Sequence, residues 1–391
     1  MKKLKRLYLK DRLTIYIKKT KPIRLSVLLI LAAVLLCSIV AMGLLGGNVS
    51  RTSAPNALTN DDVKFRMTIA GDITVDDNTR QMAESMSYSK LLRGVSKYWA
   101  DADAVVANFS GPVLRYKSEN YTSRKSAMEE SVYMRPAALR GFLDAGITLP
   151  SFANDEAFNY GISGLRSTLS LLEEYNAEYL GITADSTQPY YKTFEFAVAG
   201  EQTGTVSVLS VNDIIQSGSS VSETRPGVIN SSNISIYETI YELSETSDLL
   251  VVYAHFGEVN SNKISKEQRA LAQALIDAGA DLVVGTNTHL VQPIERYNNG
   301  LIVYGLGELL STEDYSFSCD GALLDVTVQE NGEMIAYFTP THITEGRPVV
   351  TNNWLYRNRI EGVLTNQLAD ADYSMTEDGM IAVSLGQMAQ Q

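Results

Sequence analysis

The chain has 391 residues, a formal net charge of −12 and a hydrophobic content of 45%, which allows one large or two ordinary domains with a full apolar core. Residues 1–24 carry ten Lys or Arg and one acid, so the rest of the chain has a net charge of −21. That acidic remainder excludes a nucleic-acid-binding surface, which needs a basic field. Cys37 and Cys319 are the only cysteines, which excludes a disulfide framework and a cysteine zinc site.

An uncharged run, "LSVLLILAAVLLCSIVAMGLL", occupies residues 25–45 and follows the basic segment 1–24. As a helix it is long enough to cross a hydrocarbon core of about 30 Å. The basic flank predicts a cytoplasmic N-terminus and an extracytoplasmic remainder, in a single-pass protein of the cell membrane. A cleaved signal peptide is the alternative, but it usually has a shorter apolar region and a small-residue cleavage site, which "AMGLLGG" lacks.

Residues 46–62 are rich in Gly, Ser, Asn and Pro, which predicts a flexible tether. The folded domain is expected over residues 63–345 and starts with the strand pattern "VKFRMTIAGD". Helix patterns then alternate with strand patterns, as in the helix with Ser265 as N-cap and Gly279 at its end. This alternation predicts an α/β fold with a largely parallel core, and Asn331-Gly332 predicts a hairpin. Residues 346–391 are predicted to be a polar C-terminal extension with one helical patch.

Polar side chains recur where the predicted strands end. Ligands of open α/β sheets bind beyond the carboxyl ends of the strands, so these residues are candidates for one site. Any single Asp or Asn there is more often a turn former, and a single His is more often structural. What favours a site is the repetition of such ends along the chain: Asp72, Asn108, Asn154, Asp155, Glu156, His255, Glu258, Asn287, His289 and Glu308.

Five of these residues are expected to hold a divalent ion, with Mn, Zn, Fe or Mg as the candidates. A set of imidazole, carboxylate and amide oxygen suits such ions, and a bound ion would activate a water molecule. Glu156 and His255 are the candidate catalytic residues, Glu156 as an extra ligand or general base. The predicted metal ligands are Asp72, Asn154, Glu156, His255 and His289.

The ordered motifs "IAGDITVDD", "ADAVVANFSGPV", "SFANDEAFNYG", "VVYAHFGE" and "EQRALAQALIDAGADLVVGTNTHLVQPIERYNNGLIVYGLGELL" resemble the CapA-type proteins of poly-γ-glutamate capsule synthesis. The resemblance covers residues 63–342, and the basic N-terminus, apolar run and tether match as well. It implies a four-layer fold similar to calcineurin-like metallophosphoesterases, with two packed mixed β-sheets flanked by helices. It also implies a role in making, exporting or anchoring a capsule polymer beside membrane subunits of a synthesis complex.

Several family motifs are altered in this sequence. Gly71-Asp72 and His255-Phe256-Gly257 are kept, but the family's Asn-Asn-His appears as Asn154-Asp155-Glu156. Its His-Pro-His appears as Asn287-Thr288-His289, and its last Gly-Asn as Gly307-Glu308. Glu308 is either a ligand or an exposed acid. Imidazoles are lost and carboxylates gained, so the site either holds a harder ion or is a relic on a retained scaffold.

Three functions therefore stand as hypotheses: a membrane-anchored component of capsule biosynthesis, a metal-dependent hydrolase of a phosphoester or γ-glutamyl amide, and a non-catalytic scaffold. The acidic remainder is a poor binder of an anionic surface polymer. Binding of such a polymer would need local cations, and the candidates after the second strand are Arg115, Lys117, Arg124 and Lys125.

Overall fold

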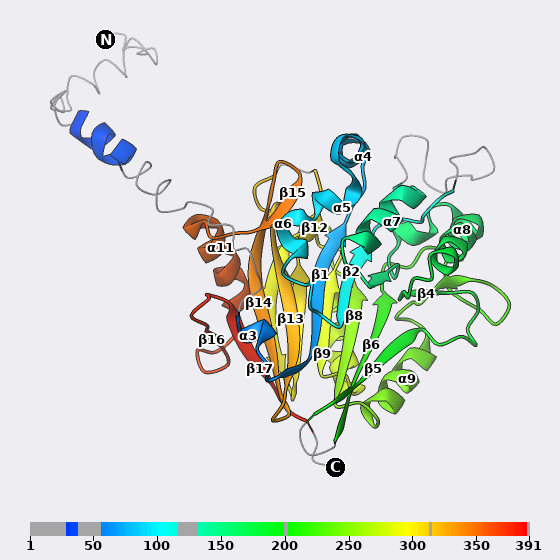
Figure 1. Ribbon diagram of the computed structural model, residues 1–391. Coiled ribbons are helices and arrows are strands. Elements are labelled where there is room, and N and C mark those ends of the chain that lie inside the picture. Colours follow the sequence, from blue (N-terminus) through cyan, green and yellow to red (C-terminus); the bar gives the residue numbers. More distant parts are fainter. Residues whose placement is uncertain (1–28, 38–55, 116–131, 199–201, 313–314, 389–391) are drawn as a thin grey trace, which may run out of the picture. The chain divides into compact units, whose positions relative to one another are not determined.

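The computed structural model describes residues 29–37, 56–115, 132–198, 202–312 and 315–388 (Figure 1). The chain separates into two compact units, residues 1–48 and 49–391. In the first unit, residues 29–37 form a helix, and the rest of the predicted span 25–45 lies outside the described residues. Among the residues described, no helix is both long and apolar enough to cross a membrane.

The second unit contains two mixed β-sheets. The larger sheet has the strand order β16-β17-β14-β13-β1-β2-β3, with β12 paired to β1 and β15 to β14. Strands β1, β2, β3 and β12 run parallel, whereas the pairs β1–β13, β13–β14, β14–β15 and β14–β17 are antiparallel. Its strands are β1 (Val63–Ile73), β2 (Ala104–Phe109), β3 (Leu149–Ser151), β12 (Glu308–Leu310), β13 (Asp320–Gln329), β14 (Glu333–Thr344), β15 (Arg347–Val350), β16 (Ser374–Met375) and β17 (Ile381–Gln387).

The smaller sheet has the order β10-β11-β9-β8-β6-β5, and its four central strands are parallel. Its strands are β5 (Tyr191–Ala197), β6 (Thr203–Asn212), β8 (Leu249–His255), β9 (Leu282–Thr286), β10 (Val291–Tyr297) and β11 (Gly300–Leu306). A short separate pair consists of β4 (Ile182–Thr183) and β7 (Gly227–Val228).

Helices cover the outer faces of both sheets. Buried side chains of α4 to α8 pack on the larger sheet, and those of α9 and α10 pack on the smaller one. A third apolar cluster, including Met67, Phe338, Val208 and Val284, joins the inner faces of the two sheets. The helices are α3 (Asn56–Thr59), α4 (Asp77–Met86), α5 (Tyr88–Leu91), α6 (Arg93–Ser96), α7 (Pro136–Asp144), η1 (Glu156–Phe158), α8 (Gly161–Glu174), α9 (Ile234–Ser244), α10 (Lys266–Asp277) and α11 (Trp354–Thr365).

The α/β fold with two packed mixed sheets flanked by helices is confirmed. The first strand, the hairpin and the helix capped by Ser265 occur where the sequence predicts them: the Ser265 hydroxyl accepts a hydrogen bond from the Gln268 N–H at 3.0 Å. Gly332 in the β13–β14 turn has a φ of 80°, a conformation that glycine adopts without steric cost.

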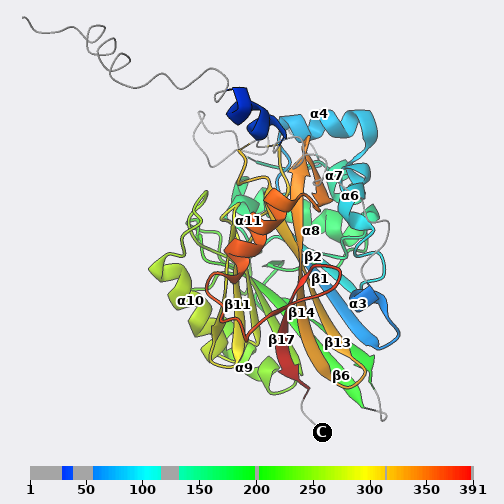
Figure 2. The same cartoon turned by 90° about the vertical axis from the view of Figure 1, so that its left-hand side faces the viewer.

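The segment after residue 345 differs from the predicted peripheral extension. Strand β17 pairs with β14 from Glu333 to Phe338, and α11 buries Ile360 and Leu364 in the cluster between the sheets. Figure 2 shows α11 and β17 on the face turned toward the viewer. A strand with one buried face exposes polar residues on its other face, and an amphipathic helix does the same. The high average polarity of this segment therefore does not reveal that some of its residues lie in the core.

Candidate functional site

The parallel strands of both sheets end at one seam. In the larger sheet Asp72 of β1 is paired with Glu308 of β12 on one side and Asn108 of β2 on the other. In the smaller sheet His255 of β8 is paired with Thr286 of β9. Side-chain contacts join the two sets of strand ends: Asn108 contacts Asp72 and His255, and Asn287, directly after β9, bonds Asp72. This agrees with the rule that sites of α/β sheets form beyond the carboxyl ends of the strands.

A close approach of two backbone segments positions Asp72. The Asp72 N–H donates to the Gly307 carbonyl at 3.3 Å. A Cβ atom on Gly71 would lie 1.8 Å from that same carbonyl oxygen. Gly71 therefore lets β1 approach the turn before Glu308, which explains the Gly-Asp pair at the end of this strand.

The carboxylate of Asp72 is held by two donors. Asn108 Nδ2 donates to Oδ1 at 2.6 Å, and the Asn287 N–H donates to Oδ2 at 3.0 Å. The Asp72 side chain is 1% exposed, so these bonds stabilise a charge that burial would otherwise disfavour. Beneath it, the Tyr253 hydroxyl donates to the Ala70 carbonyl at 2.6 Å, and burial together with the Asp72 charge raises the pKa of Tyr253.

Asn154 is held by a full set of hydrogen bonds. Its Nδ2 donates to Asn108 Oδ1 and to the Phe109 carbonyl, both at 2.9 Å. Its Oδ1 accepts the Ala157 N–H at 2.8 Å and the Gly111 N–H at 3.5 Å. The side chain thus ties the turn after β3 to the end of β2, which is the structural alternative that the sequence left open.

His255 has one engaged nitrogen and one that faces a carboxylate. Its Nδ1 lies 3.0 Å from Thr286 Oγ1 and 3.5 Å from Asn108 Nδ2, which can only donate. In the tautomer that fits this contact, Nδ1 accepts and Nε2 carries the proton. Nε2 lies 3.4 Å from Asp155 Oδ1.

The pairing of His255 with Asp155 was not predicted. The ligands predicted in "Asn154-Asp155-Glu156" are Asn154 and Glu156, and Glu156 begins η1 and accepts a hydrogen bond from Asn159 Nδ2. Gln216 Nε2 bonds the Asp155 carbonyl at 2.8 Å and so supports this turn. The alternation of side chains along a strand does not predict that Asp155 faces His255, because the backbone leaves the strand and turns into η1 directly after Asn154.

The loop after β9 contacts the neighbouring carboxylate as well. His289 Nδ1 lies 2.9 Å from Glu308 Oε1, and Glu308 is 2% exposed. Asn287 and His289 have φ values of 86° and 59°, which non-glycine residues adopt at a steric cost. The Asn287 side chain offsets part of this cost by donating to the Gly257 carbonyl at 2.7 Å.

The donor set does not fit a two-ion centre. Both Asp72 oxygens and Asn154 Oδ1 already accept N–H groups, and His289 is paired with Glu308. Within the described ranges, no three His, Cys, Asp or Glu side chains come together as a metal-binding group. A two-metal site needs a rich and closely placed ligand set, which these engaged side chains do not provide. Single-ion binding by Mn, Zn, Fe or Mg stays a prediction.

The predicted cation cluster is only partly described. Arg115 forms an ion pair with Glu174 on α8. Lys117, Arg124 and Lys125 lie outside the described residues.

Residues 66–313 match the family model described as bacterial capsule synthesis protein PGA_cap. The chain belongs to this family. The PGA_cap match starts in β1 and ends shortly after β12, so it contains every residue of the seam.

Among relatives of this PGA_cap chain, "Capsule biosynthesis protein CapA" of Bacillus anthracis is 28% identical over 390 residues, covering 97% of this chain and 92% of the relative. "PGA biosynthesis protein CapA" of Bacillus subtilis is 26% identical and covers 86% of each chain. Among solved structures, a 5'-nucleotidase precursor from Thermus thermophilus has a TM-score of 0.40 and 13% identity, covering 77% of this chain and 58% of that one.

Proposed function

We propose that this chain is a membrane-anchored, extracytoplasmic component of the machinery that makes, exports or anchors a capsule polymer such as poly-γ-glutamate. The observation that carries the proposal is the family match over residues 66–313, joined to two relatives named for capsule or PGA biosynthesis that align over most of both chains. The basic segment 1–24 and the uncharged run 25–45 support the anchor, with the N-terminus in the cytoplasm.

In this proposal the folded unit acts as a scaffold of the calcineurin-like metallophosphoesterase type. Among the strand-end residues that would hold ions in such a fold, Asp72 and Asn154 are here engaged in hydrogen bonds with Asn108 and with the backbone. The net charge of −21 after residue 24 disfavours direct binding of a polyanion by this chain. We therefore assign the main contacts to membrane subunits of a polymer synthesis or export complex.

Gene deletion and complementation test the role in a strain shown to make a surface polymer. Deletion is expected to reduce the cell-bound polymer strongly, and the wild-type gene to restore it. A deletion strain whose surface polymers are all unchanged would remove the proposal. Complementation with the double variant His255→Ala/His289→Ala, checked for folding by circular dichroism, is expected to restore the polymer if the role is a scaffold.

Hydrolysis of a phosphoester or γ-glutamyl amide is the second candidate. One observation favours it: His255 Nε2 faces Asp155 Oδ1 at 3.4 Å, an arrangement suited to moving a proton. This candidate predicts that purified protein cleaves a γ-glutamyl chain or a model phosphoester, and that His255→Ala lowers the rate by about 10²–10⁴-fold. Metal analysis of the same protein measures whether an ion takes part. Equal rates for wild type and His255→Ala would exclude this candidate.

A further inference from the structure

The segment after residue 345 exposes three large apolar side chains. Trp354 is 58% exposed, Leu355 51% and Met375 47%. Trp354 and Leu355 form the first turn of α11, and Met375 lies in β16. Arg357, one turn along α11, donates to the Gly379 carbonyl in the turn between β16 and β17, so these elements lie side by side (Figures 1 and 2).

The chain enters the folded unit next to this surface. Leu58 of α3 is 2% exposed and packs with Tyr337 and Met380 in a small apolar cluster. Met380 also lines a small pocket together with Arg357 and Gly379. Leu58 of α3 therefore packs with Met380, and Met380 lines the same small pocket as Arg357 of α11.

The length of the preceding chain limits which surface can approach a membrane. Ten residues, 46–55, separate the uncharged run from Asn56, and an extended chain of that length spans at most about 35 Å. A unit of this size has a radius of gyration of about 20 Å and is therefore roughly 50 Å across. With the anchor of the proposed function, on which this step rests, α3 stays within about 35 Å of the bilayer, so the surface around it can reach the lipid.

We propose that Trp354 and Leu355 of α11, together with Met375 of β16, contact the headgroup region of the lipid bilayer. Indole is suited to that depth, because it combines a large apolar ring with a polar N–H group. Arg357 is paired with Glu361 and Arg359 with Asp320, so both cations of the first two turns of α11 are neutralised by a carboxylate. The contact would fix the rotation of the folded unit over the membrane and thereby the direction in which the seam of strand ends points.

The two tryptophans of the chain provide a direct test. Trp99 is 1% exposed and donates its indole N–H to the Ala145 carbonyl at 3.0 Å, whereas Trp354 is exposed. Full-length protein is reconstituted in vesicles of phosphatidylcholine with or without bromine on the acyl chains. A zwitterionic lipid is chosen because Glu377 and Asp378 lie in the turn next to Met375. Bromine is expected to quench Trp354 and leave Trp99 emitting, so wild-type emission falls by about twofold.

Three variants separate the outcomes. Trp354→Phe is expected to abolish the quenching, and Leu355→Ser to weaken it. Ile234→Ser is the matched control, because Ile234 is 73% exposed on α9 and is expected to leave quenching unchanged. Equal quenching of wild type and Trp354→Phe, in protein that floats with the vesicles, would overturn the lipid contact and leave the anchor intact. Protein that fails to float with vesicles would overturn the anchor itself, and the lipid contact with it.

Discussion

At the scale of single residues, the seam is organised by amide side chains rather than by ionisable ones. Asn108 contacts Asp72, Asn154 and His255, and Asn287 holds Asp72 through its backbone and Gly257 through its side chain. An amide offers donors and an acceptor at once, so it can join a carboxylate to a carbonyl without adding charge. This explains how an acid can remain buried at the meeting point of two sheets.

Asn154→Ala is expected to lower the free energy of unfolding by about 1–3 kcal/mol, because it leaves the Ala157 N–H and the Asn108 amide oxygen buried without their partner. Urea denaturation followed by circular dichroism measures the change. Asn262→Ala, at an exposed position, is the matched control and is expected to stay within about 0.5 kcal/mol. A loss no larger than that of the control would contradict the structural role of Asn154.

The raised pKa of Tyr304 predicts that the free energy of unfolding falls at alkaline pH. Burial raises the pKa of Tyr304 to about 12, against the opposing charge of Arg269, while an unfolded chain ionises its phenols near pH 10. Between these values the folded state binds more protons than the unfolded state, so stability is full below about pH 10 and falls as pH rises toward about 12. Tyr304→Phe is expected to flatten this fall in urea midpoints, whereas Tyr191→Phe, at a more exposed edge-strand residue, is not. Parallel slopes for wild type and Tyr304→Phe would count against the assignment.

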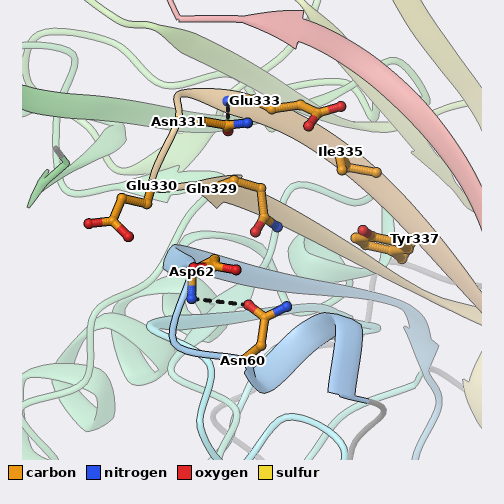
Figure 3. Close-up of a pocket in the computed structure, with 8 residues that line it drawn as sticks. All are labelled: Asn60, Asp62, Gln329, Glu330, Asn331, Glu333, Ile335 and Tyr337. Atoms are coloured by element: carbon orange, nitrogen blue, oxygen red, sulfur yellow. Dashed lines mark hydrogen bonds between the residues drawn. The ribbon is translucent and has the colours of Figure 1, made fainter.

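At the scale of elements, the helix and strand after residue 345 complete the larger sheet and the core between the sheets. Ile360 of α11 is 0% exposed and belongs to the cluster that contains side chains of both sheets. The acidic groove between the start of β1 and the β13–β14 hairpin (Figure 3) lies at the opposite end of β1 from Asp72. Its lining includes Asp62, Glu330 and Glu333. The start of β1 therefore borders an open, acidic groove, whereas its end at Asp72 is buried among the strand ends of both sheets.

Ile360→Ala is expected to destabilise the protein by about 2–5 kcal/mol, because it leaves a cavity in a closely packed core. Gly362→Ala is the control on the same helix, since its added Cβ meets no atom within 4 Å. Thermal and urea unfolding of both variants measure the difference. An Ile360→Ala protein as stable as Gly362→Ala would mean that α11 is peripheral after all.

At the scale of the whole molecule, local sequence patterns predicted the elements better than their partners. The first strand, the helix after Ser265 and the hairpin at Gly332 depend on neighbouring residues and were confirmed. The position of β17 beside β14 depends on pairing between segments far apart, for which the polar segment after residue 345 has no local signal. The strand-end rule likewise located the seam, but the pairing of His255 with Asp155 depends on how the turn after β3 folds back.

The pairing of β1 with β13 has a consequence for how the protein is made. Val63 pairs with Gln329 and Ile69 with Leu324, so the first strand has to wait for more than 250 further residues before its antiparallel neighbour exists. At a synthesis rate of about 5–20 residues per second, that wait is roughly 13–50 s. During this interval the backbone N–H and C=O groups along that edge of β1 have no strand partner. A nascent chain of this protein is therefore expected to need protection by a chaperone until its last quarter has emerged.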